Sequence, residues 1–385
     1  MTREIYLDNS ATTKPFEEVT DYISEINRNC YGNPSSLHTK GIEAEKLVNK
    51  ARRIIADSIG AEAKEIYFTS GGTEANNLAV LGYLEANIRK GKHIAASAIE
   101  HPSVLEIYKH LASKGYKVDY IKVDKSGIVD IEHLKSVISN ETALISVMLV
   151  NNETGSVQPI ETIVKLKNSI NRDTAIHVDA VQAYGKMNIN PAKSGIDIMT
   201  VSSHKIHGPK GVGAIYVDKG VKIKPIIFGG GQESLLRSGT ENVPGICGFS
   251  LAAEMMHSKI DLNISRVARL KKLFLELLES KLDDYCIISP ENGFAYILSI
   301  SFSGVKSEVL LHHLEERGIF VSTGSACSSR KNIHSHVLKA MGLKASDIDG
   351  AVRFSFSSFN TEEEIEQTVE ALKEIVLKIR VKRLK

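Results

Sequence analysis

The sequence predicts an α/β fold, in which a large domain with a mostly parallel sheet is followed by a smaller α+β domain. Strand and helix patterns alternate from about residue 40 to residue 217, as expected for repeated β–α–β units. A glycine cluster at residues 229–231 interrupts the alternation, and a long helical stretch then leads into a mixed carboxyl-terminal part. The 385 residues are enough for two domains with a substantial buried core.

Seven short apolar stretches are expected to form the sheet of the large domain. They lie at residues 65–69, 93–97, 117–122, 143–149, 175–179, 198–202 and 212–217. Apolar residues spaced three and four apart predict helices at residues 40–59, 71–89, 103–114, 130–138 and 159–171. Because helices separate most of the strands, we expect a mostly parallel seven-stranded sheet covered on both faces.

The remaining third of the chain is expected to form the connector and the smaller domain. The helical pattern from about residue 244 to residue 282 indicates a long helical stretch that connects the two domains. The elements expected after it are strands near 297–302 and 352–356 and helices near 306–317 and 361–380. We therefore assign residues 15–255 to the large domain, and residues 1–14 together with 256–385 to the small domain.

The composition excludes several classes of function. The net charge of +2 gives no bulk electrostatic reason to expect binding to nucleic acid or to a membrane surface. No apolar run approaches the roughly 18 residues of a membrane span, and the amino terminus does not resemble a signal peptide. The cysteines are far apart and have no metal-ligand spacing, so we expect no disulfide scaffold, no metal site and a cytoplasmic location. They are Cys30, Cys247, Cys286 and Cys327.

Small residues follow the first predicted strand of the sheet, where a helix begins. The stretch from Ser70 to Asn77 reads SGGTEANN. Its glycines would let backbone N–H groups approach an anion, and the helix dipole favours negative charge at that end. Thr73 adds a hydroxyl donor. The alternative is an ordinary glycine turn before a capped helix.

A carboxylate ends the apolar strand at residues 175–179. Asp179 would be poorly solvated there unless it meets a cation, such as the protonated pyridine nitrogen of pyridoxal phosphate. Gln182 follows one helical turn later and could donate to the phenolic oxygen of that ring. The alternative is an aspartate that caps a helix.

A lysine lies between two histidines after the strand at residues 198–202. Lys205 is flanked by His204 and His207 and by small residues, which should lower the pKa of its amine, as imine formation requires. The alternative is a solvated loop lysine. The order of the three motifs, each directly after a strand, favours a shared site at the carboxyl edge of the sheet.

Further motifs extend this pattern over nearly the whole chain. They are YLDNSATTK at 6–14, YGNPSSLH at 31–38, TSGGTEANN at 69–77, EHPSV at 100–104, VNNETG at 150–155, HVDAVQ at 177–182, SSHKIHGPKG at 202–211, GGGQ at 229–232, RSGTENV at 237–243, GSACSS at 324–329 and VRFSF at 352–356. The chain thereby resembles the cysteine desulfurases of the nitrogen-fixation and iron–sulfur cluster assembly type. These are class V members of the aminotransferase-like, fold type I enzymes that depend on pyridoxal 5'-phosphate. The resemblance implies conversion of L-cysteine to L-alanine with transfer of the sulfur.

The resemblance also implies roles for residues around the cofactor ring. Lys205 matches the lysine that forms a Schiff base with the cofactor and removes the substrate's α-proton, and Asp179 matches the partner of the pyridinium nitrogen. Gln182 matches the donor to the ring oxygen. His101 matches the histidine that stacks on the ring and moves protons, and Asn152 lies beside the ring and the substrate carboxylate in the family.

Other residues match the family's ligands for phosphate and substrate. The phosphate ligands implied within the chain are Gly72, Thr73, Ser202 and His204. Thr240 matches a phosphate ligand that the family supplies from the neighbouring subunit, which implies a homodimer. Arg353, assisted by Asn33, resembles the clamp for the substrate carboxylate, a task that suits a planar guanidinium.

Cys327 differs from the other three cysteines in its surroundings. It lies among small and polar residues and near Arg330 and Lys331, whose charges favour a thiolate, whereas the other cysteines are expected to pack in the core. The resemblance makes Cys327 the nucleophile that takes the sulfur as a persulfide and passes it to an acceptor. An iron–sulfur scaffold, a tRNA-thiolation enzyme and another carrier protein all remain open as that acceptor.

Two alternatives to a cysteine desulfurase remain. Another class V enzyme, such as an aminotransferase or a selenocysteine lyase, would share the lysine and the ring. An aminotransferase has no use for Cys327, whereas selenocysteine as a substrate stays open. A non-catalytic scaffold for sulfur transfer is expected to have lost the lysine, the aspartate or the cysteine, and all three are present.

Overall fold

The structure of the protein is a computed structural model that describes residues 4–323 and 334–380. Its main sheet has seven strands in the order β2-β8-β7-β6-β5-β3-β4. The strands are β2 (Ile66–Thr69), β3 (His93–Ser97), β4 (Lys117–Ile121), β5 (Thr142–Ser146), β6 (Ala175–Asp179), β7 (Ile198–Ser202) and β8 (Gly213–Val217). Strands β4, β3, β5, β6 and β7 pair in parallel, and only β8 runs antiparallel to its neighbours β2 and β7. The predicted mostly parallel seven-stranded sheet is confirmed.

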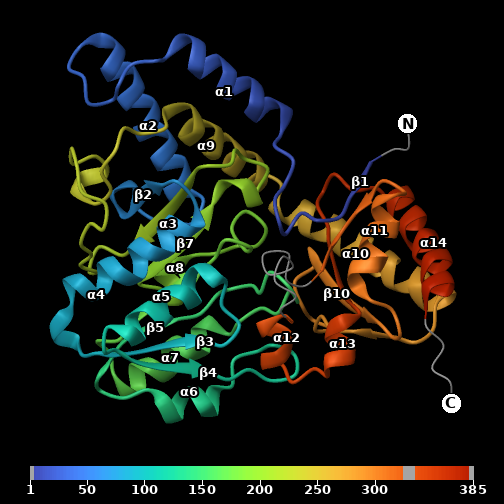
Figure 1. Cartoon of the computed structure of the whole chain (residues 1–385). Coiled ribbons are helices and arrows are strands. Elements are labelled where there is room, and N and C mark those ends of the chain that lie inside the picture. The colour runs from blue at the N-terminus through green and yellow to red at the C-terminus, as the bar shows by residue number, and fades with distance from the viewer. Residues whose placement is uncertain (1–3, 324–333, 381–385) are drawn as a thin grey trace.

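Helices cover this sheet on both faces (Figure 1). They are α1 (Glu17–Asn29), α2 (Thr39–Asp57), α3 (Gly72–Asn77), α4 (Tyr83–Ala86), α5 (Pro102–Ser113), α6 (Ile131–Val137), α7 (Ile160–Ile170), α8 (Pro191–Ser194) and α9 (Val243–His257). The helix predicted at residues 71–89 is interrupted by a π-helical turn, Leu78–Gly82, between α3 and α4. Helix α1 was not predicted, although Val19, Tyr22, Ile23 and Ile26 are spaced three and four residues apart; only Val19 and Ile26 of its thirteen residues are buried.

The small domain contains a second, antiparallel sheet in the order β12-β13-β10-β9. Its elements are α10 (Ile260–Lys281), β9 (Tyr285–Ile287), β10 (Ile297–Phe302), α11 (Ser307–Glu315), β12 (Ser322–Thr323), α12 (His336–Ala340), α13 (Ala345–Asp349), β13 (Ala351–Ser355) and α14 (Glu362–Ile379). Near the amino terminus, β1 (Ile5–Tyr6) pairs in parallel with β11 (Ile319–Phe320), so the amino-terminal segment joins this half of the molecule. The predicted domain limits at residues 15 and 256 stay a prediction.

The long helical stretch predicted at residues 244–282 is helical but is divided into two parts. The chain forms two helices, α9 and α10, with a break at Ser258 and Lys259. Helix α9 packs on α1 and α2 of the large domain, whereas α10 packs on α14, and its Phe274 contacts the rings of Phe354 and Phe356. Two helices with different packing partners need different axes, which a continuous apolar period does not reveal.

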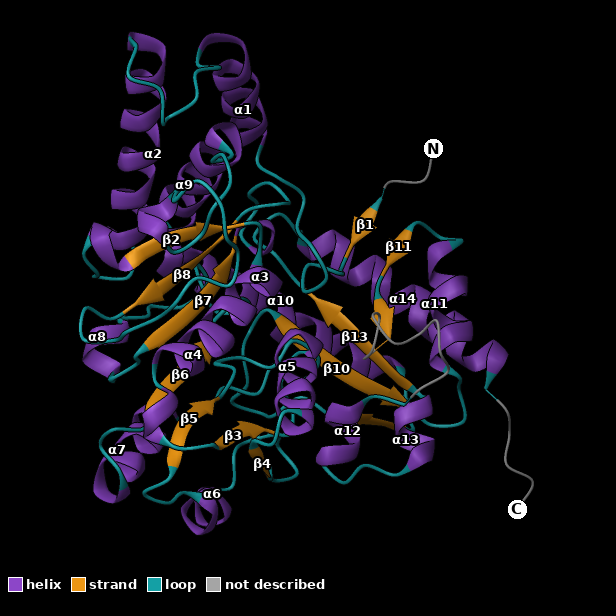
Figure 2. Ribbon diagram, turned by 60° about the vertical axis from the view of Figure 1, so that its left-hand side comes forward, coloured by secondary structure: helices purple, strands orange, loops and turns teal. Residues whose placement is uncertain are grey.

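Parallel packing brings the carboxyl ends of β3, β6 and β7 to one edge of the main sheet (Figure 2). The turn from β2 into α3 lies beside that edge, since a Cβ on Gly213 of β8 would stand 2.8 Å from the Cα of Gly71. Gly71 has φ 149°, a conformation that glycine adopts far more readily than other residues. None of the helices in the described part of the chain is long and apolar enough to cross a membrane.

Candidate active site

Asp179 is the last residue of β6 and is 5% exposed. Its Oδ2 accepts a hydrogen bond from Asn76 Nδ2 at 2.8 Å, and its Oδ1 accepts one from the backbone N–H of Val181 at 3.0 Å. Neither donor carries a charge, and no ion pair to Asp179 is found among residues 4–323 and 334–380. A buried carboxylate held only by neutral donors suits a site where a bound cation completes the pairing.

His101 follows β3 and begins α5 as its N-cap residue. Its Nδ1 accepts from the backbone N–H of Ser103 at 3.1 Å and lies 2.8 Å from Ser103 Oγ. Burial lowers the pKa of His101, and the nearby Lys205 lowers it further against the opposing effect of Asp179. The imidazole is therefore neutral near pH 7, and because Nδ1 is an acceptor, the ring proton lies on Nε2.

A hydrogen-bonded chain connects His101 to Asp179. Asn76 Nδ2 donates both to Asp179 Oδ2 and to Ser103 Oγ, the latter at 2.9 Å. The sequence reasoning did not single out Asn76 or Ser103, although both lie inside the TSGGTEANN and EHPSV motifs. Their role depends on the packing of α3 against α5, which no local pattern reveals.

Lys205 ends a short 3₁₀ turn, Ser203–Lys205, directly after β7. Its Nζ donates to the backbone carbonyls of Ser10 and Ala11, the latter at 2.7 Å. Gln182 Nε2 donates to the same Ser10 carbonyl at 2.9 Å. The amino-terminal segment therefore reaches into the edge of the large sheet and contacts both predicted cofactor residues.

The residues predicted to bind phosphate lie along the turn before α3 and after β7. Ser202 is 1% exposed and its Oγ has no hydrogen-bond partner among the described residues. His204 Nδ1 lies 3.2 Å from Thr12 Oγ1, and burial together with Lys205 lowers its pKa to about 4. A Cβ on Gly72 would approach Val181 Cγ2 to 3.0 Å, whereas Thr73 is exposed beside it.

Several buried polar atoms in this region have no partner among the described residues, and they indicate whether a cofactor fits. They are Asn76 Oδ1, Gln182 Oε1 and Ser202 Oγ. Unsatisfied buried polar atoms are costly and uncommon in native structures. Asn76 is bonded to Asp179, and Gln182 shares the Ser10 carbonyl with Lys205, so these atoms fit a bound group that has polar atoms of its own.

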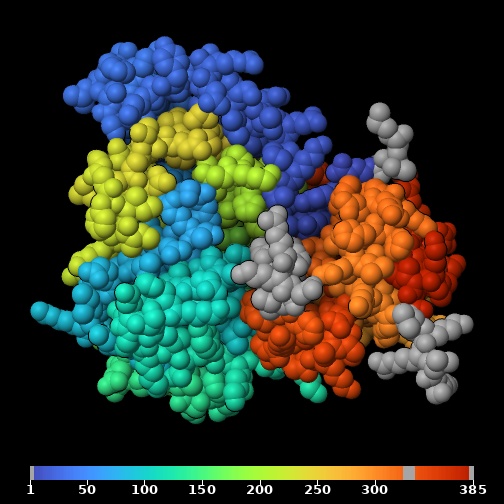
Figure 3. Space-filling view, in the orientation of Figure 1, coloured from blue at the N-terminus to red at the C-terminus, as the bar shows by residue number. Residues whose placement is uncertain are grey.

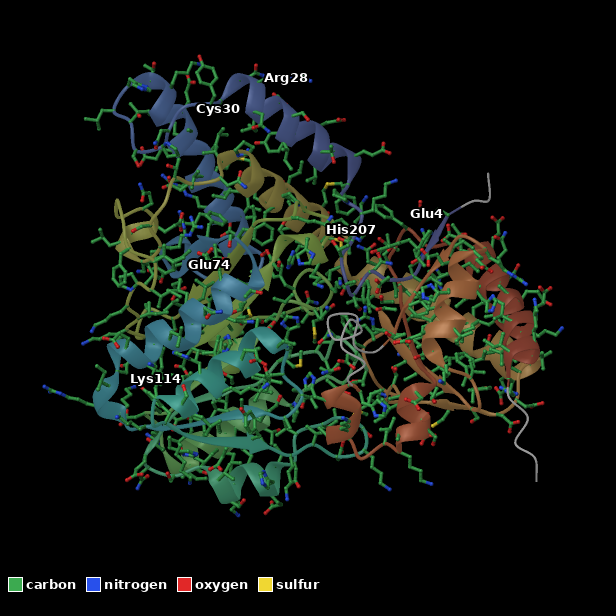
Figure 4. The ribbon with its side chains drawn as sticks, viewed as in Figure 1. Glu4, Arg28, Cys30, Glu74, Lys114 and His207 are labelled. Atoms are coloured by element: carbon green, nitrogen blue, oxygen red, sulfur yellow. The ribbon has the colours of Figure 1, made fainter. Side chains whose placement is uncertain are left out.

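Thr240 is exposed and lies in a segment that is fastened to α3. Arg237 Nε donates to Glu74 Oε1 at 2.7 Å, and the Glu74 label in Figure 4 marks this position on the helix. Glu233 accepts two hydrogen bonds from Arg52, at 2.6 Å and 2.8 Å, and holds a left-handed turn at residues 233–235. The role of Thr240 across a subunit interface stays a prediction.

Arg353 lies on β13 of the small domain and is 3% exposed. Its Nη1 donates to the backbone carbonyl of Asn152 at 3.0 Å, and its Nη2 donates to Asp8 Oδ1 at 2.6 Å. Its Nε is buried without a partner among the described residues. The guanidinium is thus fixed in place by two hydrogen bonds.

The structure does not bring Asn33 to Arg353 within one chain. Asn33 is exposed in the loop between α1 and α2, at the top of Figure 1, where its Oδ1 accepts from the backbone N–H of Ser35 at 2.9 Å. The label of His207 in Figure 4 lies at the border between the large and the small domain. The loop between α1 and α2, which follows the labelled Cys30, lies well away from it. Assistance of Arg353 by Asn33 therefore stays a prediction.

The cysteines divide as follows. Cys30 and Cys247 are buried, as predicted, and burial raises the pKa of the Cys247 thiol to about 11. Cys286 is exposed, so the prediction that it packs in the core is wrong. It lies on β9 at the edge of the small sheet, where one face of the strand meets solvent. Cys327 lies outside the described residues.

Comparisons with known proteins agree with this geometry. Residues 5–368 match the family model described as aminotransferase class-V. The chain is 41% identical over 381 residues to a protein named cysteine desulfurase IscS from Dictyoglomus turgidum, covering 99% of this chain and 96% of that one. It is 43% identical over 378 residues to a cysteine desulfurase from Trichormus azollae, covering 98% and 94%. A solved structure described as a NifS-like protein superposes with a TM-score of 0.92 at 38% identity, covering 98% of this chain and all of that one. The chain belongs to the class V aminotransferase family.

Proposed function

We propose that this protein is a pyridoxal-phosphate-dependent cysteine desulfurase, which converts L-cysteine to L-alanine and takes up the sulfur. The observation that carries the proposal is the meeting of Asp179, His101 and Lys205 at one edge of the sheet, next to buried polar atoms that have no partner in the part of the chain that the structure describes. The names of the similar proteins from Dictyoglomus turgidum and Trichormus azollae support the same activity.

The residues at the sheet edge would hold the cofactor in a defined orientation. Asp179 would pair with the ring nitrogen, His101 would lie against the ring, and Gln182 would face the ring oxygen. The phosphate would be held by Gly72, Thr73, Ser202 and His204, with Thr240 of the partner subunit. When bound, pyridoxal phosphate draws electrons away from the substrate's α-carbon and so makes its proton removable.

Three side chains of the protein would then act on the substrate. Arg353 binds the carboxylate of cysteine, using the Nε that has no partner in the described structure. Lys205 Nζ accepts the α-proton and returns a proton as alanine forms. The thiolate of Cys327 attacks the substrate sulfur. A sulfur–sulfur bond forms, the carbon–sulfur bond breaks, and its electron pair stays with the carbon that becomes the methyl group of alanine.

We further propose a homodimer that passes the persulfide sulfur to an acceptor protein. Iron–sulfur cluster assembly and tRNA or cofactor thiolation are both compatible with the site. The reaction needs a free thiol at Cys327, which a reducing compartment such as the cytoplasm maintains. Selenocysteine could use the same lysine and ring.

A turnover assay tests the proposed function. The holoenzyme is incubated with L-cysteine and a thiol reductant, and alanine and sulfide are quantified. Equal amounts of alanine and sulfide are expected, and L-serine, which lacks the sulfur, should give neither. A protein that binds pyridoxal phosphate but makes no alanine from cysteine contradicts the proposal.

A further inference from the structure

One loop of the large domain holds two separate parts of the site. The backbone carbonyl of Asn152 accepts from Arg353 Nη1 at 3.0 Å, and the next residue, Glu153, accepts from Ser335 Oγ at 2.5 Å. Ser335 follows the segment that carries Cys327 and is the N-cap residue of α12. Two adjacent residues therefore connect the substrate clamp to the carboxyl-terminal flank of the cysteine segment.

The contact between Glu153 and Ser335 is buried on both sides. Glu153 is 4% exposed and Ser335 is 3% exposed, and burial raises the pKa of the Glu153 carboxyl to about 7. Burying an acid costs free energy, so this carboxyl is a poor choice if its only purpose is stability. The loop around it is rigid, since Asn151 Oδ1 accepts from the backbone N–H groups of Glu153 and Thr154 at 2.9 Å and 3.0 Å.

A second contact fixes the same end of α12. His336 Nε2 lies 2.9 Å from the backbone carbonyl of Glu100, the residue before His101, and donates to it. The apolar side chains of α12 pack in the same cluster as Ile99 and Met148 of the large domain. Figure 3 shows this orange-red part of the small domain lying directly against the blue-green surface of the large one.

The other flank of the cysteine segment is tied to the same arginine. Ser322 of β12 is the register partner of Arg353 on β13. The segment therefore leaves β12 beside Arg353, and it ends at Ser335, which reaches Arg353 through Glu153 and Asn152. Both ends have a fixed position relative to the residue that would hold the substrate carboxylate.

We propose that Glu153 and Ser335 are positioning residues for sulfur transfer, because they set the carboxyl-terminal anchor of the Cys327 segment relative to Arg353. This inference rests on the proposed function. Reacting groups must be aligned to within a fraction of an ångström, and a misplacement of about 1 Å can lower a rate about 100-fold. Loss of the contact should therefore lower kcat, while cofactor binding and the KM for cysteine stay close to wild type.

The test uses a substitution that keeps the helix cap but breaks the contact. In Ser335→Asp, the new carboxylate can still accept from the backbone N–H of Leu338, which Ser335 Oγ now does at 3.2 Å. The assays are run at pH 9, above the pKa of about 7 of the Glu153 carboxyl, so that two carboxylates face each other and repel. The double variant Glu153→Gln with Ser335→Asp restores a donor opposite the new acceptor. Asn190→Ala, which removes the cap of the short helix α8 far from the site, is the matched control.

We expect Ser335→Asp to have a kcat about 10-fold to 100-fold below wild type and a KM that is little changed. The double variant should recover most of the lost kcat. Hydrogen exchange of residues 334–341 should speed up in Ser335→Asp and slow again in the double variant. Asn190→Ala should keep kcat. If Ser335→Asp does not fold, Ser335→Ala and Ser335→Thr give the same comparison, with kcat lost in the first and retained in the second.

Two results would overturn different parts of the reasoning. Normal turnover by the wild type together with an unchanged kcat in Ser335→Asp, despite faster exchange at residues 334–341, refutes the positioning role alone. A wild-type holoenzyme that makes no alanine from cysteine refutes the proposed function, and the inference with it.

Discussion

Replacing Arg353 with lysine tests the substrate clamp quantitatively. The substitution keeps the positive charge but removes the guanidinium fork, including the Nε that has no partner among the described residues. A hydrogen bond to a charged group contributes about 1.5 to 3 kcal/mol. Since about 1.4 kcal/mol corresponds to a factor of ten, losing one such bond to the substrate carboxylate should raise the KM for cysteine about 10-fold to 150-fold.

The assay is alanine formation over a range of cysteine concentrations, for wild type and Arg353→Lys holoenzyme of equal cofactor content. Because Arg353 also bonds to Asp8 and Asn152, the unfolding midpoint of each protein is measured alongside. Arg317→Lys is the matched control, since Arg317 forms an exposed ion pair with Glu374 in the same domain and should keep the wild-type KM. A folded Arg353→Lys protein with an unchanged KM would refute the clamp.

Three further predictions concern the cofactor lysine, a buried acid and a buried ion pair. Lys205→Ala should retain no covalently bound cofactor after borohydride reduction and unfolding, whereas wild type should retain it; retention in the variant would move the attachment elsewhere. Burial raises the pKa of Glu100 from 4.5 to about 8, so between these pH values the folded protein holds a proton that the unfolded chain releases. The free energy of unfolding should therefore fall as pH rises from about 4.5 to about 8, by at most about 1.4 kcal/mol per pH unit. Urea unfolding of Glu100→Gln should lack this decline, and parallel pH profiles for the two proteins would contradict the assignment. Arg52→Ala leaves the buried carboxylate of Glu233 uncompensated and should lower the free energy of unfolding by about 3 kcal/mol or more. Lys40→Ala at an exposed pair should have a far smaller effect, and equal losses would show that burial of the pair does not matter.

Much of the fold could be predicted because buried strands leave a clear pattern. Strands β6 and β7 have the predicted limits, since each is a run of buried residues bounded by polar or turn-forming ones. The helix break at Ser258 was missed because it depends on which domain each half packs against. Helix α9 is apolar on most of its faces and α10 is amphipathic, but both patterns are helical, and no proline or glycine marks the break between them.

The site could be predicted only where its residues follow strands or match family motifs. Asp179 ends β6 and Lys205 lies three residues after β7, and parallel pairing brings these strand ends together. Asp8 was not predicted as the partner of Arg353, because the two residues are 345 positions apart and meet only through tertiary packing. Ser335 was missed for the same reason, since its bond to Glu153 spans 182 positions.

The position of the sulfur after the first turnover tests the central claim most directly. Holoenzyme is incubated with L-cysteine in the absence of reductant, digested and analysed by mass spectrometry. The peptide that contains Cys327 should gain the mass of one sulfur atom, and this gain should disappear on treatment with a thiol and be absent in Lys205→Ala. Alanine formation with no added sulfur on Cys327, or with sulfur on Cys286 instead, would contradict the account.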